Sequence, residues 1–316
     1  MPSKKTRQII KIIKEIAQIE KIKFQTFSSD WIIELQKDQT KKYIHGYHFE
    51  INSTTSSMLA NDKAASSILL TNAHIPNIEH KLFFNPNLGD YINPNGNWEE
   101  INKYFKKHKK IVAKPNNGTG GTNVFLISKK YELEKAINYL FTKERMICLS
   151  PFKKIKNEYR VIILNNEPLL IYKKNIPKLI GNGRDSVLKI LEKNFSQEEI
   201  IKVIKNFEHQ KEPLNKILKK DEILNLNWKH NLGQGAQAEI IKNKKIKNKL
   251  IKLAQNAARA INIRFASIDI VEVGNEFLIL EINSGVMLEN FSKNSLENYK
   301  ITKEIYKKAI LEMFQI

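Results

Sequence analysis

Residues 265–285 read Phe-Ala-Ser-Ile-Asp-Ile-Val-Glu-Val-Gly-Asn-Glu-Phe-Leu-Ile-Leu-Glu-Ile-Asn-Ser-Gly. Two largely apolar runs, 265–273 and 276–283, flank the pair Gly274-Asn275. A short Gly-containing turn between two such runs is typical of a β-hairpin. The stretch therefore predicts two antiparallel strands. Because residues 277–280 are continuously apolar, we expect this hairpin to be buried.

Polar side chains at the end of this hairpin far from the turn predict a metal site. Pairing across the turn places Asp269 near Glu281, and the strand period of two places Glu281 and Asn283 on one face. Two carboxylates and an amide oxygen make an oxygen-only site that suits Mg²⁺ and leaves positions for phosphate oxygens. The alternative is an ordinary polar face of an amphipathic hairpin. We favour the metal site because a buried glutamate without a partner is costly.

A second candidate site is Lys114-Pro115-Asn116-Asn117-Gly118-Thr119-Gly120-Gly121-Thr122, between two short apolar runs. Three glycines in four positions let the backbone approach a ligand closely and direct several N–H groups at one anion. The lysine can place a charge on a phosphate. The stretch has neither the Gly-Lys-Ser/Thr ending of a Walker loop nor the Gly-x-Gly-x-x-Gly spacing of a dinucleotide-binding loop. A phosphate-binding loop and a plain flexible loop both remain open.

The rest of the chain indicates a mixed fold. Helices are predicted over residues 7–23, 61–72, 98–109, 130–141, 246–261 and 299–313, together with a Lys- and Glu-rich helical surface insertion at 195–225. Strands are predicted over 31–35, 43–51, 111–114, 124–127, 146–149, 159–164 and 168–172, and a long loop over 85–97. Helices mixed with antiparallel hairpins indicate an α+β or α/β protein without internal repeats.

Length and composition exclude several classes of protein. A chain of 316 residues with 41% hydrophobic content can build two domains, or one large domain with two lobes. The single cysteine, Cys148, excludes a disulfide framework and a cysteine-rich zinc site. No apolar run is long enough to span a membrane, and the charged start lacks the apolar core of a secretory signal. We therefore expect a soluble cytoplasmic protein with no membrane partner.

The chain is strongly basic, with 53 Lys and Arg against 33 Asp and Glu and a formal net charge of +20. Such a balance can indicate binding to nucleic acid or another polyanion. Only six of these residues are arginines, however, and nucleic-acid readers depend on arginine for bidentate contacts. Abundant lysine beside abundant Ile and Asn is also the pattern of a bias toward A/T-rich codons. We favour the codon bias and consider nucleic-acid binding unlikely.

Four short pieces, in this order, resemble the ATP-grasp superfamily, especially its cyanophycin synthetase, glutathione synthetase and ribosomal-protein glutamate ligase branches. They are Asn61-Asp62-Lys63 followed by Ile75-Pro76; Lys114-Pro115 with the glycine-rich loop; Glu158-Tyr159-Arg160-Val161; and Asp269-Ile270 with Glu281-Ile282-Asn283-Ser284-Gly285. Residues 180–184, Ile-Gly-Asn-Gly-Arg, look like a turn of cyanophycin-synthetase-like members. The resemblance covers residues 30–315 and implies two α+β lobes that hold ATP between them. It implies a short substrate-side region at 1–57, an N-terminal lobe at 58–150 and a C-terminal lobe at 151–316.

The resemblance also implies a role for each matched residue. The ATP phosphates would contact Lys63 and Lys114, and the loop Asn117, Gly118, Thr119, Gly120, Gly121 and Thr122 would close over them. Adenine would lie along the hinge at Cys148, Leu149, Ser150 and Phe152, where the family commonly has a Glu or Gln, and Glu158 would face the sugar or base. Mg²⁺, or Mn²⁺ in its place, would be held by Asp269, Glu281 and Asn283. Catalytic positions would be Arg160, either Lys173 or Lys174, and Asn231.

The activity that the resemblance implies is ATP-dependent ligation of a carboxylate to an amine through an acylphosphate, with release of ADP and phosphate. An amino acid or peptide is the expected substrate, and the basic surface would suit an acidic one. Two other classes remain open: a kinase built on the same fold, and a lysine-rich nucleic-acid-binding protein with a degenerate nucleotide site. A homodimer is also left open. His45 and His48 lack companions at metal-ligand spacing and are expected to be ordinary surface or core histidines.

Overall fold

The computed structural model describes residues 6–86, 98–118, 120–197, 200–201, 203–204, 214–226, 232 and 236–315. The chain divides into two compact units. The first comprises Met1–Tyr172 and Ile241–Ile316, and the second comprises Lys173–Ile240. The boundaries of these compact units differ from the predicted three-part division at residues 57 and 150, and that division stays a prediction.

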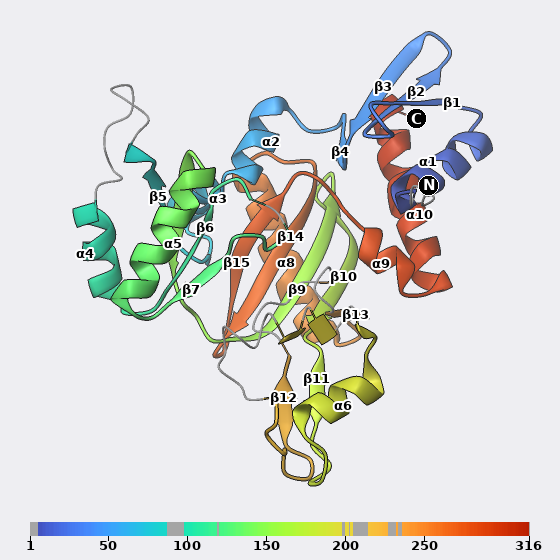
Figure 1. Cartoon of the computed structure of the whole chain (residues 1–316). Helices are drawn as coiled ribbons and strands as arrows, with labels where there is room; N and C mark the ends of the chain where they lie inside the picture. Colours follow the sequence, from blue (N-terminus) through green and yellow to red (C-terminus); the bar gives the residue numbers. More distant parts are fainter. Residues whose placement is uncertain are drawn as a thin grey trace. The chain divides into compact units, whose positions relative to one another are not determined.

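The largest sheet of the first unit holds the hairpin that the sequence predicts. Its strands lie in the order β10 (Glu167–Asn175), β9 (Ile155–Leu164), β14 (Phe265–Val273) and β15 (Glu276–Asn283). Helix α8 (Lys244–Ala260) packs on one face of this sheet (Figure 1). Its buried Leu250, Ala254 and Ala257 join a core with alternate residues of the strands. Since strand side chains alternate between faces, every second residue of β9, β14 and β15 is left for the opposite face.

A second sheet in the same unit carries the glycine-rich loop. Its strands lie in the order β5 (Lys81–Phe84), β8 (Met146–Pro151), β6 (Ile111–Pro115) and β7 (Phe125–Ile127), all antiparallel. Helices α4 (Trp98–His108) and α5 (Lys130–Lys143) bury Ile101, Leu133 and Ile137 in its core. The loop connects β6 to β7, as predicted. Two short helices, α2 (Thr54–Asn61) and α3 (Lys63–Asn72), precede this sheet in the chain.

The start and the end of the chain pack together. Helix α1 (Gln8–Ile19) precedes an antiparallel sheet of β1 (Lys23–Phe27), β2 (Ile32–Lys37), β3 (Thr40–His45) and β4 (His48–Phe49). The chain ends with α9 (Glu289–Lys293) and α10 (Leu296–Phe314), and α1 contacts both of these helices (Figure 1). The Glu289 carboxylate accepts hydrogen bonds from Gln8 N and Ile9 N, at 2.9 and 3.0 Å. An acidic side chain there is favourable because the first N–H groups of a helix lack partners within it.

The second unit has its own small core. Strands β11 (Lys178–Ile180) and β12 (Ile223–Asn225) pair antiparallel, beside helix α6 (Val187–Asn194), and β13 (Gln237–Ile240) ends the unit. Leu179, Val187, Leu191 and Leu218 are buried together. The prediction of a helical insertion over 195–225 is wrong for its described end, because turns and β12 occupy residues 214–225.

The predicted mixed α and β fold is confirmed, with three differences in detail. Helix α1 ends at Ile19 and the chain is already in a strand at Lys23. The helix predicted over 61–72 is α3, which begins at Lys63, and the separate helix α2 before it was not predicted. The strand predicted over 43–51 is β3 and β4 with a turn at Gly46. None of the helices in the described part of the chain is long and apolar enough to cross a membrane.

Candidate active site

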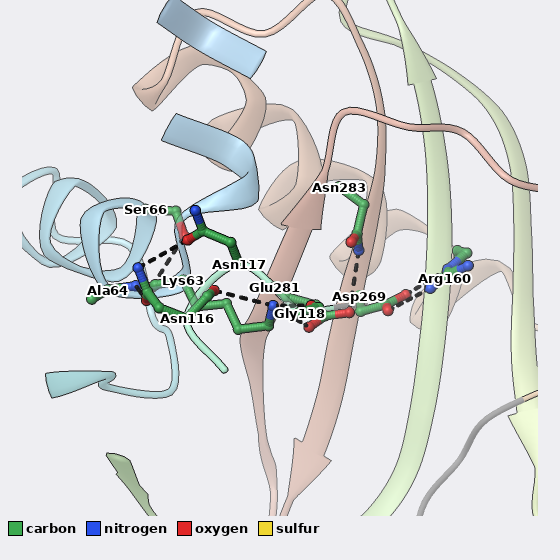
Figure 2. A network of polar contacts seen from close by, with 10 residues as sticks. All are labelled: Lys63, Ala64, Ser66, Asn116, Asn117, Gly118, Arg160, Asp269, Glu281 and Asn283. Carbon is green, nitrogen blue, oxygen red and sulfur yellow. Dashed lines mark hydrogen bonds and ion pairs between the residues drawn. The ribbon is translucent and has the colours of Figure 1, made fainter. Parts of the chain in front are cut away.

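The candidate site lies on the face of the large sheet opposite α8. Asp269 of β14 pairs in register with Arg160 of β9 on one side and with Glu281 of β15 on the other. Directly paired residues of neighbouring strands project from the same face. Their chain neighbours Val161 and Ile268 belong instead to the core against α8. Arg160, Asp269 and Glu281 therefore form one row across three strands (Figure 2).

The first pair in this row is a buried bidentate ion pair. Arg160 Nε lies 2.7 Å from Asp269 Oδ1, and Arg160 Nη2 lies 2.6 Å from Asp269 Oδ2. The Asp269 side chain is 2% exposed and that of Arg160 is 15% exposed. Burial acts to lower the pKa of Arg160, but the charge of Asp269, the nearby Tyr172 and the hydrogen bonds to Asp269 together outweigh burial, and the pKa lies above its ordinary value. The two hydrogen bonds are short, as is typical of bonds between a guanidinium and a carboxylate.

The predicted metal ligands are neighbours on this face. Asn283 is two residues beyond Glu281, and its Nδ2 donates to Glu281 Oε1 at 3.2 Å (Figure 2). The described residues include no cluster of three or more His, Cys, Asp or Glu that could hold a metal alone. Two carboxylates and one amide oxygen are nevertheless a donor set that fits Mg²⁺ when phosphate oxygens complete it. The ligand assignment stays a prediction, in which the oxygens of Asp269 would contact Mg²⁺ as well as Arg160.

Lys63 brings the far end of the row into contact with the glycine-rich loop. It is the first residue of α3, is 8% exposed, and its Nζ lies 4.0 Å from Glu281 Oε2. The same ammonium donates to the main-chain oxygens of Gly118 and of Asn116, the latter at 3.4 Å. Asn116 Oδ1 accepts from Ala64 N at 3.1 Å, which fixes the loop to the first turn of α3 (Figure 2). Two candidate pieces about fifty residues apart in the chain are thus one structure.

The loop itself has the backbone that its glycines allow. Gly120 and Gly121 have φ angles of +68° and +70°, in the left-handed region that side chains disfavour. Lys114, in β6 before the loop, is 8% exposed. Asn117, Gly118 and Thr122 are also part of this described segment, whereas Thr119 lies outside the described residues.

The predicted hinge is buried strand. Cys148, Leu149 and Ser150 are all buried in β8, and Cys148 pairs in register with Lys114. Burial raises the pKa of the Cys148 thiol to about 11, so this thiol is not a nucleophile at neutral pH. Phe152 follows the strand, and the Lys110 ammonium lies 4.2 Å from the centre of its ring.

Glu158 shares the site face with Arg160, because the two residues lie two apart in β9. It is 7% exposed. A carboxylate here is therefore on the same side of the sheet as the Arg160–Asp269 pair. Its assignment to the nucleotide sugar or base stays a prediction.

The three remaining predicted catalytic residues are Lys173, Lys174 and Asn231. Lys173 and Lys174 belong to the second unit, where the strand alternation places them on opposite faces of β10. Lys174 is 4% exposed and Lys173 is partly exposed, which makes the two distinguishable although the sequence could not separate them. Asn231, with neighbouring Gly233, Gln234 and Gly235, lies outside the described residues.

Two polar residues at the site were missed by sequence reasoning. Asn116 is fully buried and joins the loop to α3, and its place inside the loop motif was a signal for such a role. His80 is 3% exposed, and its Nε2 has no hydrogen-bond partner in the described structure. Burial, then the charges of Lys114 and Lys63, hold the pKa of His80 well below its ordinary value. No pattern in the sequence distinguishes His80.

Two segments match models of known domains. Residues 221–307 match the RimK-like ATP-grasp domain, and residues 93–187 match the ATP-grasp domain of prokaryotic glutathione synthetase. The chain is an ATP-grasp protein. The two matched segments contain the glycine-rich loop, Arg160 and the row of metal-ligand candidates. Comparison with curated protein sequences gives no match.

Solved structures support the ATP-grasp fold. A bifunctional glutathione synthetase from Pasteurella multocida is 14% identical over 94% of this chain, with a TM-score of 0.55. A D-alanine–D-alanine ligase from Bacillus anthracis is 15% identical over 84% of the chain, with a TM-score of 0.54. The ATP-grasp ligase PsnB, in complex with a variant of its minimal precursor, Mg and ADP, is 14% identical over 83%, with a TM-score of 0.50. This chain spans 44%, 69% and 61% of those three chains, respectively.

Proposed function

We propose that this ATP-grasp protein is an ATP-dependent carboxylate–amine ligase that acts on an amino acid or a peptide. The observation that carries the proposal is the row Arg160–Asp269–Glu281, with Lys63 at its far end. This row places fixed cations beside a set of oxygen ligands on one buried face. Transfer of a phosphoryl group to a carboxylate needs such an arrangement, because charge develops on oxygens of both partners.

Each residue of the row has a defined task in this reaction. Lys63 and Lys114 would neutralise the ATP phosphates, and Asp269, Glu281 and Asn283 would hold Mg²⁺. The bound Mg²⁺ would supply a Lewis acid on phosphate oxygens. Arg160 would orient the acceptor carboxylate and then the acylphosphate. The loop at residues 116–122 would exclude water, because an acylphosphate otherwise hydrolyses.

The proposed substrate class, an amino acid or a peptide, is supported by the structural neighbours of the chain. The structural neighbours named above include a glutathione synthetase, a D-alanine–D-alanine ligase and a ligase bound to a peptide precursor. Each of these names indicates an amino acid or peptide substrate. The net charge of +20 favours an acidic substrate, such as a Glu-rich peptide, through long-range attraction.

Phosphate release and mass spectrometry together test this function. The protein is incubated with MgATP and a panel of amino acids and short acidic peptides. We expect Mg²⁺-dependent phosphate release and a product lighter by one water than two panel members combined. Glu281→Gln should abolish both signals. Glu276→Gln, which changes an exposed glutamate at the other end of β15, should leave both unchanged.

Other outcomes of these assays would indicate a different function. A stable phosphate ester without free phosphate would identify a kinase. Binding to nucleic acid that weakens steeply with salt and ignores MgATP would identify a nucleic-acid-binding protein. Phosphate release that survives Glu281→Gln would refute the assignment of the site.

A further inference from the structure

A histidine outside the ATP site contacts the loop that follows the metal-ligand strand. His48 lies in β4, and its Nδ1 is 3.2 Å from Ser284 Oγ. Ser284 comes directly after Asn283, the last residue of β15. The adjacent backbone is tied in the same place, because Val286 N donates to Tyr47 O at 3.1 Å. His48 is therefore held in a fixed position beside the end of the candidate metal site.

The hydrogen bonds around Ser284 assign the protons. The hydroxyl has a single hydrogen, and Asn61 Oδ1, an acceptor only, lies 3.1 Å from Ser284 Oγ. Ser57 O, a second acceptor, lies 3.4 Å away. The hydroxyl hydrogen is thus directed at an oxygen, so His48 Nδ1 must donate its own proton to Ser284 Oγ. The lone pair of the imidazole is then on Nε2.

The ring of His48 lies against Gly285. A Cβ atom placed on Gly285 would be 3.0 Å from His48 Nε2 and 3.2 Å from Cε1. Real Cβ contacts are rarely so close, so the absence of a side chain at residue 285 is what admits the imidazole. His48 as a whole residue is exposed to solvent, although its ring is partly covered.

We propose that His48 is the general base that receives the proton of the attacking amine in the ligation. This inference rests on the proposed function. The amine nitrogen attacks the acylphosphate carbon, a C–N bond forms, and the C–O bond to phosphate breaks. Phosphate leaves with the electron pair of that bond, and the amine proton passes to His48 Nε2. Ser284 and Asn61 fix the ring as the second and third groups of a catalytic triad fix a histidine.

The surroundings of His48 keep it able to accept a proton. Partial burial, and then the nearby His45, lower the pKa of His48 below its ordinary value, so the ring is neutral at pH 7. His45 pairs with it in register across the turn between β3 and β4. The other groups that contact the ring or its serine partner, Ser57, Asn61, Ser284 and Gly285, carry no charge.

Hydroxylamine separates the two half-reactions. It is an unprotonated nucleophile at neutral pH, and it captures an acylphosphate as a hydroxamate without help from a base. The wild-type protein and His48→Ala are compared with hydroxylamine and with the panel amines as acceptors, using the panel carboxylate that gives the most hydroxamate. We expect His48→Ala to keep hydroxamate formation within about threefold of the wild-type rate. Amide formation should fall by about 100-fold or more, the usual loss when a general base is removed.

Two further measurements are specific to a base. Added imidazole should restore part of the amide formation of His48→Ala, because the substitution leaves room beside Gly285. Amide formation by the wild-type protein should decline as the pH falls through the pKa of His48, and this limb should be absent from the His48→Ala profile. His74→Gln, the matched control at an exposed histidine after α3, should form amide at the wild-type rate.

The inference about His48 is overturned if His48→Ala forms amide at the wild-type rate. It is also overturned if the variant loses hydroxamate and amide formation equally, which would indicate a structural role. Failure of the wild-type protein to form either product with any panel carboxylate would refute the proposed ligase function, and the role of His48 with it.

Discussion

Removal of Arg160 should destabilise the first unit strongly, because it leaves a carboxylate buried without its partner. Asp269 is 2% exposed, and both of its oxygens accept from Arg160. Breaking a buried ion pair by removing one member costs about 3–5 kcal/mol. For a domain of about 150–250 residues, each kcal/mol lowers the midpoint of thermal unfolding by about 2–4 °C. Arg160→Ala should therefore unfold about 6–20 °C below the wild-type protein.

Differential scanning calorimetry at pH 7 checks this expectation, with Arg264→Ala as the matched control. Arg264 also forms an ion pair, with Glu312, but its side chain is 49% exposed and that of Glu312 is 27% exposed. Exposed pairs contribute about 0–1 kcal/mol, so the control should shift the midpoint by about 4 °C or less. The reasoning is refuted if the two variants unfold at the same temperature.

The same variant tests the metal site. In Arg160→Ala the oxygens of Asp269 are no longer occupied by a guanidinium. If Asp269, Glu281 and Asn283 bind Mg²⁺, millimolar Mg²⁺ should raise the unfolding temperature of Arg160→Ala more than that of the wild-type protein. Equal shifts in Arg160→Ala and in the double variant Arg160→Ala/Asp269→Ala would exclude Asp269 as a ligand.

Three smaller predictions follow from single groups. Because the pKa of Cys148 is about 11, iodoacetamide at pH 8 should modify the chain only after unfolding. Asp62→Ala removes the side chain that accepts from Ala65 N at the start of α3, and calorimetry should show a loss of about 1 kcal/mol that Asp62→Asn avoids. Hydrogen bonds from Lys193 and then other neighbours hold the pKa of Asp185 at about 2. Its stabilising contribution should persist down to about pH 4 and disappear toward pH 2, as NMR titration can follow.

Local sequence patterns were sufficient to predict an element when the residues within and next to it determine where it begins and ends. The hairpin β14–β15 has the bounds that its apolar runs and Gly-Asn turn predict. The prediction of one strand over 43–51 failed because the turn at Gly46 depends on a distant residue. Gly46 has a φ of +62°, and a Cβ there would be 3.0 Å from the ring of Trp31. Packing against Trp31 requires a glycine at this position, and the sequence of residues 43–51 alone does not reveal that packing.

The site shows the same division between local and non-local information. Asp269, Glu281 and Asn283 could be grouped from one hairpin, because strand alternation fixes their face. The ion pair between Arg160 and Asp269 could not be predicted from the sequence. It depends on the register between β9 and β14, which are more than one hundred residues apart in the chain. The same is true of His48, whose partner Ser284 is 236 residues away. A histidine without nearby ligands in the sequence was therefore interpreted as ordinary.

In the structure, four charged groups of the candidate site are paired, Lys63 with Glu281 and Arg160 with Asp269. Lys63 bonds to loop carbonyl groups and faces Glu281, while Arg160 occupies both oxygens of Asp269. If MgATP binds as proposed, Lys63 would leave Gly118 for a phosphate, and Asp269 would share its oxygens between Arg160 and Mg²⁺. Each exchange would replace one charge-assisted contact by another. Burying these charges would therefore cost little free energy either before or after binding. Under the proposed function, release of Gly118 from Lys63 would also free the glycine-rich loop to close over the phosphates, and loop movement would then be coupled to nucleotide binding.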